Sequence, residues 1–215
     1  MTTLGKAGIA IASVGAVGGA TTYGIYEFNK ADTESNQEQT SLNNSVSFKD
    51  KLGVSVLSLT GETEQTQWTT RLKELSEAIT NLPADLTSLK TGKGWKDLQQ
   101  WCNTNSTSVE VTSTNYQNFE TFCTWKVGDK DWTGKISADT PNTDQKWGTA
   151  HAALKKKPEN TLSSELKEIH KKTSSTEDEH ADKKAMHKWC IDSYKKIWTG
   201  ESDETLKEVK EYCKN

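Results

Sequence analysis

The sequence has few apolar residues, few prolines and almost no arginine. Only 32% of its 215 residues are hydrophobic, proline occurs three times and arginine once, and the mean hydropathy is −0.80. This apolar share excludes a multi-pass membrane protein, and any core must rely on a few large side chains. With 27 basic against 30 acidic residues, nothing predicts a nucleic-acid partner.

The sequence also lacks the short motifs of common catalytic sites. It contains no HExxH, GxSxG or P-loop pattern, and the isolated GKG at 92–94 is not a dinucleotide-binding fingerprint. His180 and His187 share a predicted helix face with acidic neighbours, but a solvated charged helix explains them better than a metal site. We therefore expect no enzyme activity: no catalytic residues, no metal site and no cofactor.

A charge-free segment stands near the N-terminus. Residues 7–26 carry no charged side chain over twenty positions, the length that spans about 30 Å of hydrocarbon as a helix. We predict a transmembrane anchor within residues 1–28, with a cleavable signal peptide ending near 18–20 as the alternative. No cysteine follows directly, which excludes a lipoprotein anchor.

One face of this segment carries only small residues, four positions apart. Such a stripe allows close helix packing in a bilayer and predicts self-association, although a Gly/Ala-rich segment also produces it by chance. Its members are Gly8, Ala12, Ala16, Ala20 and Gly24.

The rest of the chain is predicted to be all-α. Residues 29–45 are polar enough to form a flexible stalk, and 46–215 form a helical ectodomain with two related halves, about 63–125 and 146–213. A short strand near 109–111 is the expected exception. Apolar residues three or four apart predict the helical faces, among them Trp68, Leu72, Leu75 and Ile79 before Pro83, and Trp147, His151 and Leu154 before Pro158.

The last third of the chain carries helix-end signals. Thr176 and Glu179 have the spacing of a capping box at the start of a long helix. Gly200 is placed to end that helix, and Asp203 is in the region that starts the next one.

Every cysteine follows an aromatic residue, and three of the four end an apolar pattern with offsets of three and seven, which Lys183 breaks in the copy before Cys190. This places each cysteine on a buried helix face. Separations of 21 and 23 residues, symmetric about polar turns, predict helical hairpins closed by Cys102–Cys123 and Cys190–Cys213. Four free core cysteines or a zinc site are the alternatives, but no CxxC pair supports zinc.

These features together resemble a known group of proteins. A short Gly/Ala-rich membrane segment without a lipobox precedes a polar ectodomain with motifs such as Lys188-Trp189-Cys190 and Glu211-Tyr212-Cys213. In this the chain resembles the paralogous, uncharacterised membrane-anchored protein families of haemotropic mycoplasmas. The single arginine, Arg71, among many lysines fits an A+T-rich genome. The resemblance implies membrane attachment with surface display or antigenic variation, and it carries over no catalytic residue.

We therefore expect a single-pass protein of the cell membrane whose C-terminal part is extracellular. Its expected partners are the membrane and a host component or another surface protein. Two alternatives stay open. One is an intracellular Cys/His metal-binding or redox protein, and the other is a structural membrane-associated subunit that pairs through the stripe at 8–24.

Overall fold

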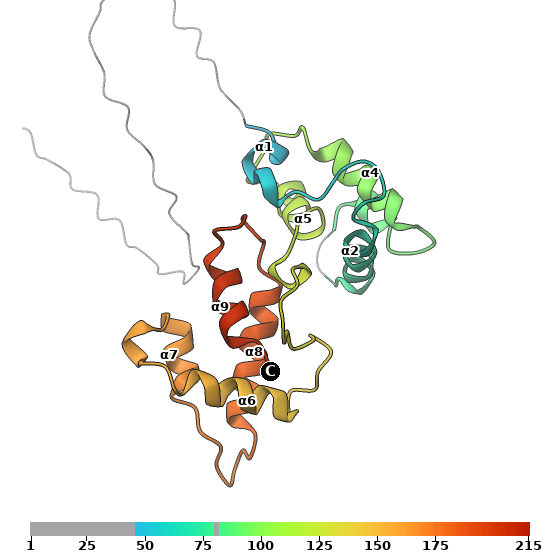
Figure 1. Ribbon diagram of the computed structural model, residues 1–215. Helices are drawn as coiled ribbons and strands as arrows, with labels where there is room; N and C mark the ends of the chain where they lie inside the picture. Colours follow the sequence, from blue (N-terminus) through green and yellow to red (C-terminus); the bar gives the residue numbers. More distant parts are fainter. Residues whose placement is uncertain (1–45, 80–81) are drawn as a thin grey trace, which may run out of the picture. The chain divides into compact units, whose positions relative to one another are not determined.

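The computed structural model describes residues 46–79 and 82–215, which form short helices joined by turns (Figure 1). The mostly helical fold predicted from the sequence is confirmed for these residues, whose only β-pairing consists of isolated bridges. In chain order the elements are α1 (Phe48–Leu52), η1 (Gly53–Ser55), α2 (Gln65–Glu77), α3 (Ala84–Thr87), α4 (Trp95–Asn105), α5 (Thr114–Phe122), η2 (Val127–Asp129), α6 (Gln145–Leu154), η3 (Glu159–Thr161), α7 (Ser164–His170), α8 (Ala181–Tyr194) and α9 (Glu204–Tyr212).

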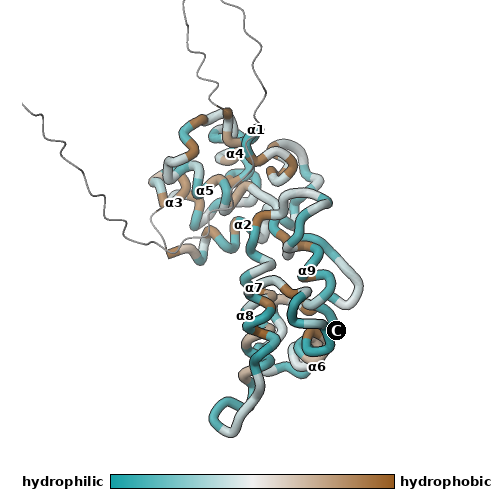
Figure 2. The backbone as a smooth tube through the Cα atoms, turned by 90° about the vertical axis from the view of Figure 1, so that its left-hand side faces the viewer, coloured by the Kyte–Doolittle hydropathy of each residue, from teal (hydrophilic) through white to brown (hydrophobic). Residues whose placement is uncertain are grey.

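The predicted membrane anchor lies outside the described residues, as do its small-residue stripe (Gly8, Ala12, Ala16, Ala20 and Gly24) and the stalk at 29–45. Across 46–79 and 82–215, apolar residues form short stretches interrupted by hydrophilic ones (Figure 2). None of the helices in these two ranges combines the length and the apolar character that crossing a membrane requires.

The strand predicted near 109–111 is wrong, because this segment consists of turns. The Val111 amide donates to the Val109 carbonyl oxygen at 3.0 Å, and the Ser113 amide donates to the Glu110 carbonyl oxygen at 3.0 Å. These local bonds use groups that a strand would offer to a neighbour. The Ser113 hydroxyl then caps α5 by accepting from the Tyr116 amide at 3.1 Å.

Two predicted helix ends are also wrong. Ile79 is 99% exposed and lies beyond α2, because the backbone becomes extended at Ala78. The capping box at Thr176 does not form, since Ser175 and Asp178 close a turn of their own and α8 begins only at Ala181.

The C-terminal boundary of α8 differs from the prediction as well. The helix ends at Tyr194 rather than at Gly200, because residues 196–198 leave it to pair with residues 125–127. Gly200 has φ +118° and shapes the turn before α9, and Asp203 caps α9 by accepting from the Leu206 amide at 2.9 Å.

The buried apolar residues form two clusters, one after the other along the chain. The first runs from Phe48 to Cys123 and the second from Val127 to Cys213, while Trp125 packs against both. We call residues 48–125 module 1 and residues 127–215 module 2. Each module begins earlier in the chain than the corresponding half predicted from helical periodicity, which starts at about 63 or 146. The reason is that each module also includes a non-helical segment that packs against its helices.

Each module is closed by the same backbone hydrogen bond. The Leu57 amide donates to the Cys123 carbonyl oxygen at 2.9 Å in module 1, and the Ile136 amide donates to the Cys213 carbonyl oxygen at 3.1 Å in module 2. Isolated antiparallel bridges flank both bonds, at Val56–Thr124 and Lys135–Lys214. The start of each module is therefore joined to the residue after its last helix.

The first third of each module aligns without a gap. Six of the 28 positions from 48 to 75 carry the residue found 79 positions later. The structural counterparts keep this offset, since Phe48 and Val127 each donate a backbone amide to the loop between their module's last two helices, at 2.8 and 2.9 Å. The identical pairs are Asp50/Asp129, Lys51/Lys130, Ser58/Ser137, Trp68/Trp147, Thr70/Thr149 and Leu75/Leu154. The two modules are a tandem repeat.

A fully buried tryptophan anchors the first long helix of each module. Trp68 on α2 and Trp147 on α6 have no exposed surface. Each indole N–H donates to a backbone carbonyl oxygen of the preceding segment, that of Ser58 at 3.2 Å and that of Thr140 at 3.4 Å. The large apolar ring and its satisfied N–H together attach the helix to the loop that precedes it in its module.

Candidate functional site

The four cysteines form the two pairs that the spacing predicts. Cys102 and Cys123 join α4 to the end of α5 with their Cα atoms 5.7 Å apart, and Cys190 and Cys213 join α8 to the end of α9 with a Cα–Cα distance of 5.9 Å. All four are fully buried. The chain-entropy model assigns each such loop closure about 3 kcal/mol of stability.

The aromatic residue before the first cysteine of each pair binds a carboxylate on a neighbouring short helix. The Trp101 indole N–H donates to Asp85 of α3 at 2.7 Å, and that of Trp189 donates to Glu165 of α7 at 3.3 Å. At Trp101-Cys102 and Trp189-Cys190 the aromatic-Cys motif thus has a structural explanation, because the cysteine closes the hairpin while the aromatic ring fills the core and holds the short helix.

A short ladder joins the modules. Lys126 and Ile197 form an antiparallel bridge, and the Trp198 amide donates to the Trp125 carbonyl oxygen at 3.0 Å. The two indole rings lie edge to face with centroids 6.5 Å apart. The Lys130 ammonium is 3.7 Å from the Trp125 ring centroid and 3.5 Å from that of Trp198, which makes a cation–π clamp.

Beside this ladder lies the chain's only arginine, which is buried. Arg71 of α2 is 1% exposed, and its guanidinium forms ion pairs with Glu74 at 3.0 Å and with Asp129 of η2. Its Nε donates to the Thr124 carbonyl oxygen at 3.2 Å. A guanidinium suits this position because its planar array of donors serves several acceptors at once.

Lys126 is a second buried cation in the same region, and it is 8% exposed. Its ammonium donates to the Glu120 carbonyl oxygen at 2.7 Å and to the Thr124 hydroxyl at 3.0 Å. Desolvation and the nearby Arg71 charge lower the pKa of Lys126 to about 8, against the opposing effect of nearby carboxylates.

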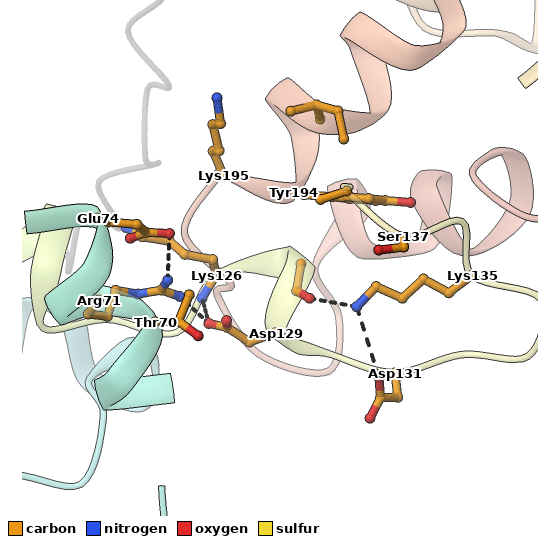
Figure 3. A pocket seen from close by; sticks show the side chains of 13 residues that line it. Thr70, Arg71, Glu74, Lys126, Asp129, Asp131, Lys135, Ser137, Tyr194 and Lys195 are labelled. Atoms are coloured by element: carbon orange, nitrogen blue, oxygen red, sulfur yellow. Dashed lines mark hydrogen bonds and ion pairs between the residues drawn. The ribbon is translucent and has the colours of Figure 1, made fainter. Parts of the chain in front are cut away.

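A pocket of about 560 Å³ opens between these charged groups and α8. Figure 3 shows Arg71 and Glu74 on the α2 wall, with Tyr194 and Ser137 across the pocket from them. The lining residues are Thr70, Arg71, Glu74, Lys126, Gly128, Asp129, Asp131, Lys135, Ser137, Ala138, Ile191, Tyr194 and Lys195. A volume of this size accommodates a small organic molecule.

The opposite wall is rigidly assembled. The Tyr194 hydroxyl donates to the Ile136 carbonyl oxygen at 3.0 Å, and burial raises the pKa of this phenol. The Lys135 ammonium donates to the carbonyl oxygens of Gly128 and Lys130 at 2.6 and 2.8 Å, and burial lowers the pKa of Lys135. A side chain at Gly128 would place its Cβ 2.8 Å from the Tyr194 Cβ, so glycine is needed for this close approach.

Trp125, Trp132 and Trp198 lie beside turns in the sequence, where an indole ring is a candidate for ligand contact. Trp125 and Trp198 instead hold Lys130, and Trp132 packs edge to face on Tyr194 with a centroid distance of 5.6 Å. None of the three lines the pocket. The buried cations of the pocket were missed, because neither Arg71 nor Lys126 belongs to a recognisable motif.

The histidines and acidic residues of the described ranges form no group of three or more metal-ligating side chains. No protein-family model, characterised protein or solved structure matches the chain.

Proposed function

We propose that this chain is a membrane-attached surface protein whose two disulfide-closed modules lie outside the cell and bind a host component or another surface protein. The observation that carries the proposal is the pairing of all four cysteines, each fully buried within a helical hairpin. Disulfides persist on the oxidising side of a membrane and are rare in a reducing cytosol.

Two further features support this proposal. The charge-free segment at 7–26 has the length of a membrane anchor, and it precedes both modules in the chain. The aromatic-Cys motifs resemble those of the membrane-anchored families of haemotropic mycoplasmas, for which surface display or antigenic variation is suspected.

Surface proteolysis of intact cells tests the topology. We expect added protease to release fragments of residues 46–215 while a cytosolic marker protein stays intact. Full protection of these residues in intact cells, followed by digestion after lysis, would place the modules inside and refute the proposal.

The redox state is tested on the same cells by alkylation before lysis and non-reducing mass spectrometry. We expect cross-linked peptides that contain Cys102 with Cys123 and Cys190 with Cys213. Four alkylated thiols would contradict the extracellular assignment and favour the intracellular alternative. A reduced cytosolic protein, alkylated in the same sample, serves as the control for oxidation during lysis.

A further inference from the structure

A groove of about 300 Å³ lies between α7 and α8 of module 2, and we call it the α7–α8 groove. We propose that it binds the phenol ring of a tyrosine side chain from a partner protein, with the phenolic hydroxyl bonded to that of Ser193. This inference rests on the proposed function and deepens it, because it names the side chain by which the partner is held. The lining residues are Glu165, Ile169, Ala185, Lys188, Trp189, Asp192, Ser193 and Lys196.

Ser193 brings a buried polar group without a partner to the α7–α8 groove. It is 1% exposed, and its hydroxyl forms no hydrogen bond with any described residue. A serine within a helix can donate to the carbonyl oxygen four residues earlier, which here belongs to Trp189, but this bond is not formed. An unpaired buried hydroxyl is unfavourable, and an occupant of the groove with one polar atom would compensate it.

Module 1 shows the same position with its polar group satisfied. Trp101-Cys102 corresponds to Trp189-Cys190, because each tryptophan donates to a carboxylate on a short helix and each cysteine closes a hairpin. Three residues after its cysteine, module 1 has Asn105, whose side-chain amide donates to the Trp101 carbonyl oxygen at 2.9 Å. Module 2 has the shorter Ser193 there, without such a bond. The unpaired hydroxyl is therefore specific to module 2 and is not required by the hairpin.

The apolar residues of the α7–α8 groove favour an aromatic occupant. Trp189, Ile169 and Ala185 contribute apolar atoms to its lining. A second ring can stack on the Trp189 indole or meet it edge to face, which adds to the gain from burial. A volume of about 300 Å³ is at the lower end of the range for small-molecule sites, so it suits a single ring better than a larger ligand.

The charged residues of the α7–α8 groove favour a neutral occupant. The Lys188 Nζ lies 2.5 Å from a carboxylate oxygen of Asp192, and the Lys196 Nζ lies 3.6 Å from one of Glu165. The two pairs leave the lining without net charge, so neither an acid nor an amine gains a counter-ion there. A tyrosine side chain combines a neutral ring with one hydroxyl, and tyrosine is enriched among the residues that anchor protein interfaces.

Fluorine NMR of the full chain in detergent micelles, labelled with fluorotryptophan, tests the proposal. The probe is N-acetyltyrosinamide. N-acetylphenylalaninamide lacks only the hydroxyl, and p-cresol is a free phenol without a peptide backbone. We expect the tyrosine probe to shift the Trp189 resonance, assigned with Trp189→Phe, with a dissociation constant in the millimolar range and at least about fivefold tighter than the phenylalanine probe. The Trp101 resonance of module 1 should not move and is the internal control.

Substitutions at Ser193 identify the bonded group. Ser193→Ala should bind the two amides equally, because it removes the hydroxyl and leaves the apolar lining intact. Ser193→Asn should weaken both amides by at least about tenfold, because the larger side chain reproduces the Asn105 arrangement and fills the groove. Ser76→Ala is the matched control, since Ser76 is an exposed serine on α2 that donates to the Lys73 carbonyl oxygen.

Circular dichroism and thermal unfolding establish that each variant is folded. Equal affinity of the wild type for the two amides, an unchanged preference in folded Ser193→Ala, a shift with p-cresol but not with the tyrosine probe, or no shift with any probe would overturn the proposal. These outcomes do not bear on surface exposure. Protection of the modules in intact cells would refute the proposed function and leave the measured affinities unchanged.

Discussion

Arg71 and Asp129 form an ion pair that joins the first long helix of module 1 to the first turn of module 2. Arg71 is 1% exposed and Asp129 has a side-chain exposure of 12%, so the pair is largely desolvated. Breaking one partner of such a pair leaves an uncompensated buried charge. The single arginine of the chain is therefore expected to matter more for stability than the composition suggests.

We predict that Arg71→Met destabilises the protein by about 3 kcal/mol, because Asp129 then remains buried without its cation. Urea unfolding measures this change. In a double-mutant cycle with Asp129→Asn, the two losses should be strongly non-additive. The control is Glu74→Gln, whose half-exposed carboxylate should contribute no more than about 1 kcal/mol. An effect of Arg71→Met as small as that of Glu74→Gln would show that the pair is not buried in solution.

The two disulfides should contribute equally and independently. The double variants Cys102→Ala/Cys123→Ala and Cys190→Ala/Cys213→Ala should each lose about 3 kcal/mol of unfolding free energy, because the closed loops are of nearly equal length. Unfolding of the wild type in dithiothreitol separates the loss of the cross-link from the loss of sulfur packing. If one pair could be removed without any loss, loop closure would not explain its presence.

Lys126 should make stability depend on pH in the alkaline range. Its pKa is lowered from 10.5 to about 8 in the folded protein, so between these values the unfolded chain binds more protons. Stability should therefore rise with pH from about 8 to 10.5, by an amount on the order of 3 kcal/mol. Below pH 8 the ammonium is charged in both states and its burial is unfavourable.

Urea unfolding of wild type and Lys126→Met between pH 7 and pH 10.5 measures this contribution. The variant should be the more stable at pH 7, and the difference should shrink as pH rises. Comparison with the variant is needed because burial also lowers the pKa of Lys130 and Lys135, which add to the slope in both proteins. Parallel pH curves for the two proteins would mean that Lys126 titrates normally.

The cation–π clamp offers a fourth prediction. Lys130→Met retains the apolar stem but removes the charge between Trp125 and Trp198, and we expect a loss of about 1 kcal/mol and a shift in tryptophan fluorescence. The repeat supplies the control. Its counterpart Lys51 lies 5.2 Å from the single ring of Tyr116, so Lys51→Met should cost less. Equal effects of the two substitutions would show that the second ring adds nothing.

The helical faces and the cysteine pairing could be predicted from the sequence because both depend on spacing along a helix. Trp68, Trp147 and all four cysteines are buried as the periodicity indicates. The early end of α8 could not be predicted, since hydrogen bonds to the distant residues 125–127 determine it. Local propensity does not contain that information.

The pocket was harder to predict from the sequence than the helices and turns were. Arg71 shares the buried face of α2 with Trp68 and Leu75, a spacing that indicates its burial but not its partners, and Lys126 is one of many lysines. Their burial arises only where the start of module 2 packs against α2 and α8. The repeat offset was hidden for a similar reason, because few aligned residues are identical while the closing hydrogen bonds at Leu57 and Ile136 are the same.

The two cross-links affect how the chain responds to tension. When such a chain is pulled between its termini, the residues enclosed by a disulfide bear no load and cannot be extended. The two disulfide loops span 21 and 23 residues, so about 150 Å of contour length in total cannot be extended while the disulfides are intact. Under tension, each module should therefore lengthen only through the segments outside its disulfide loop.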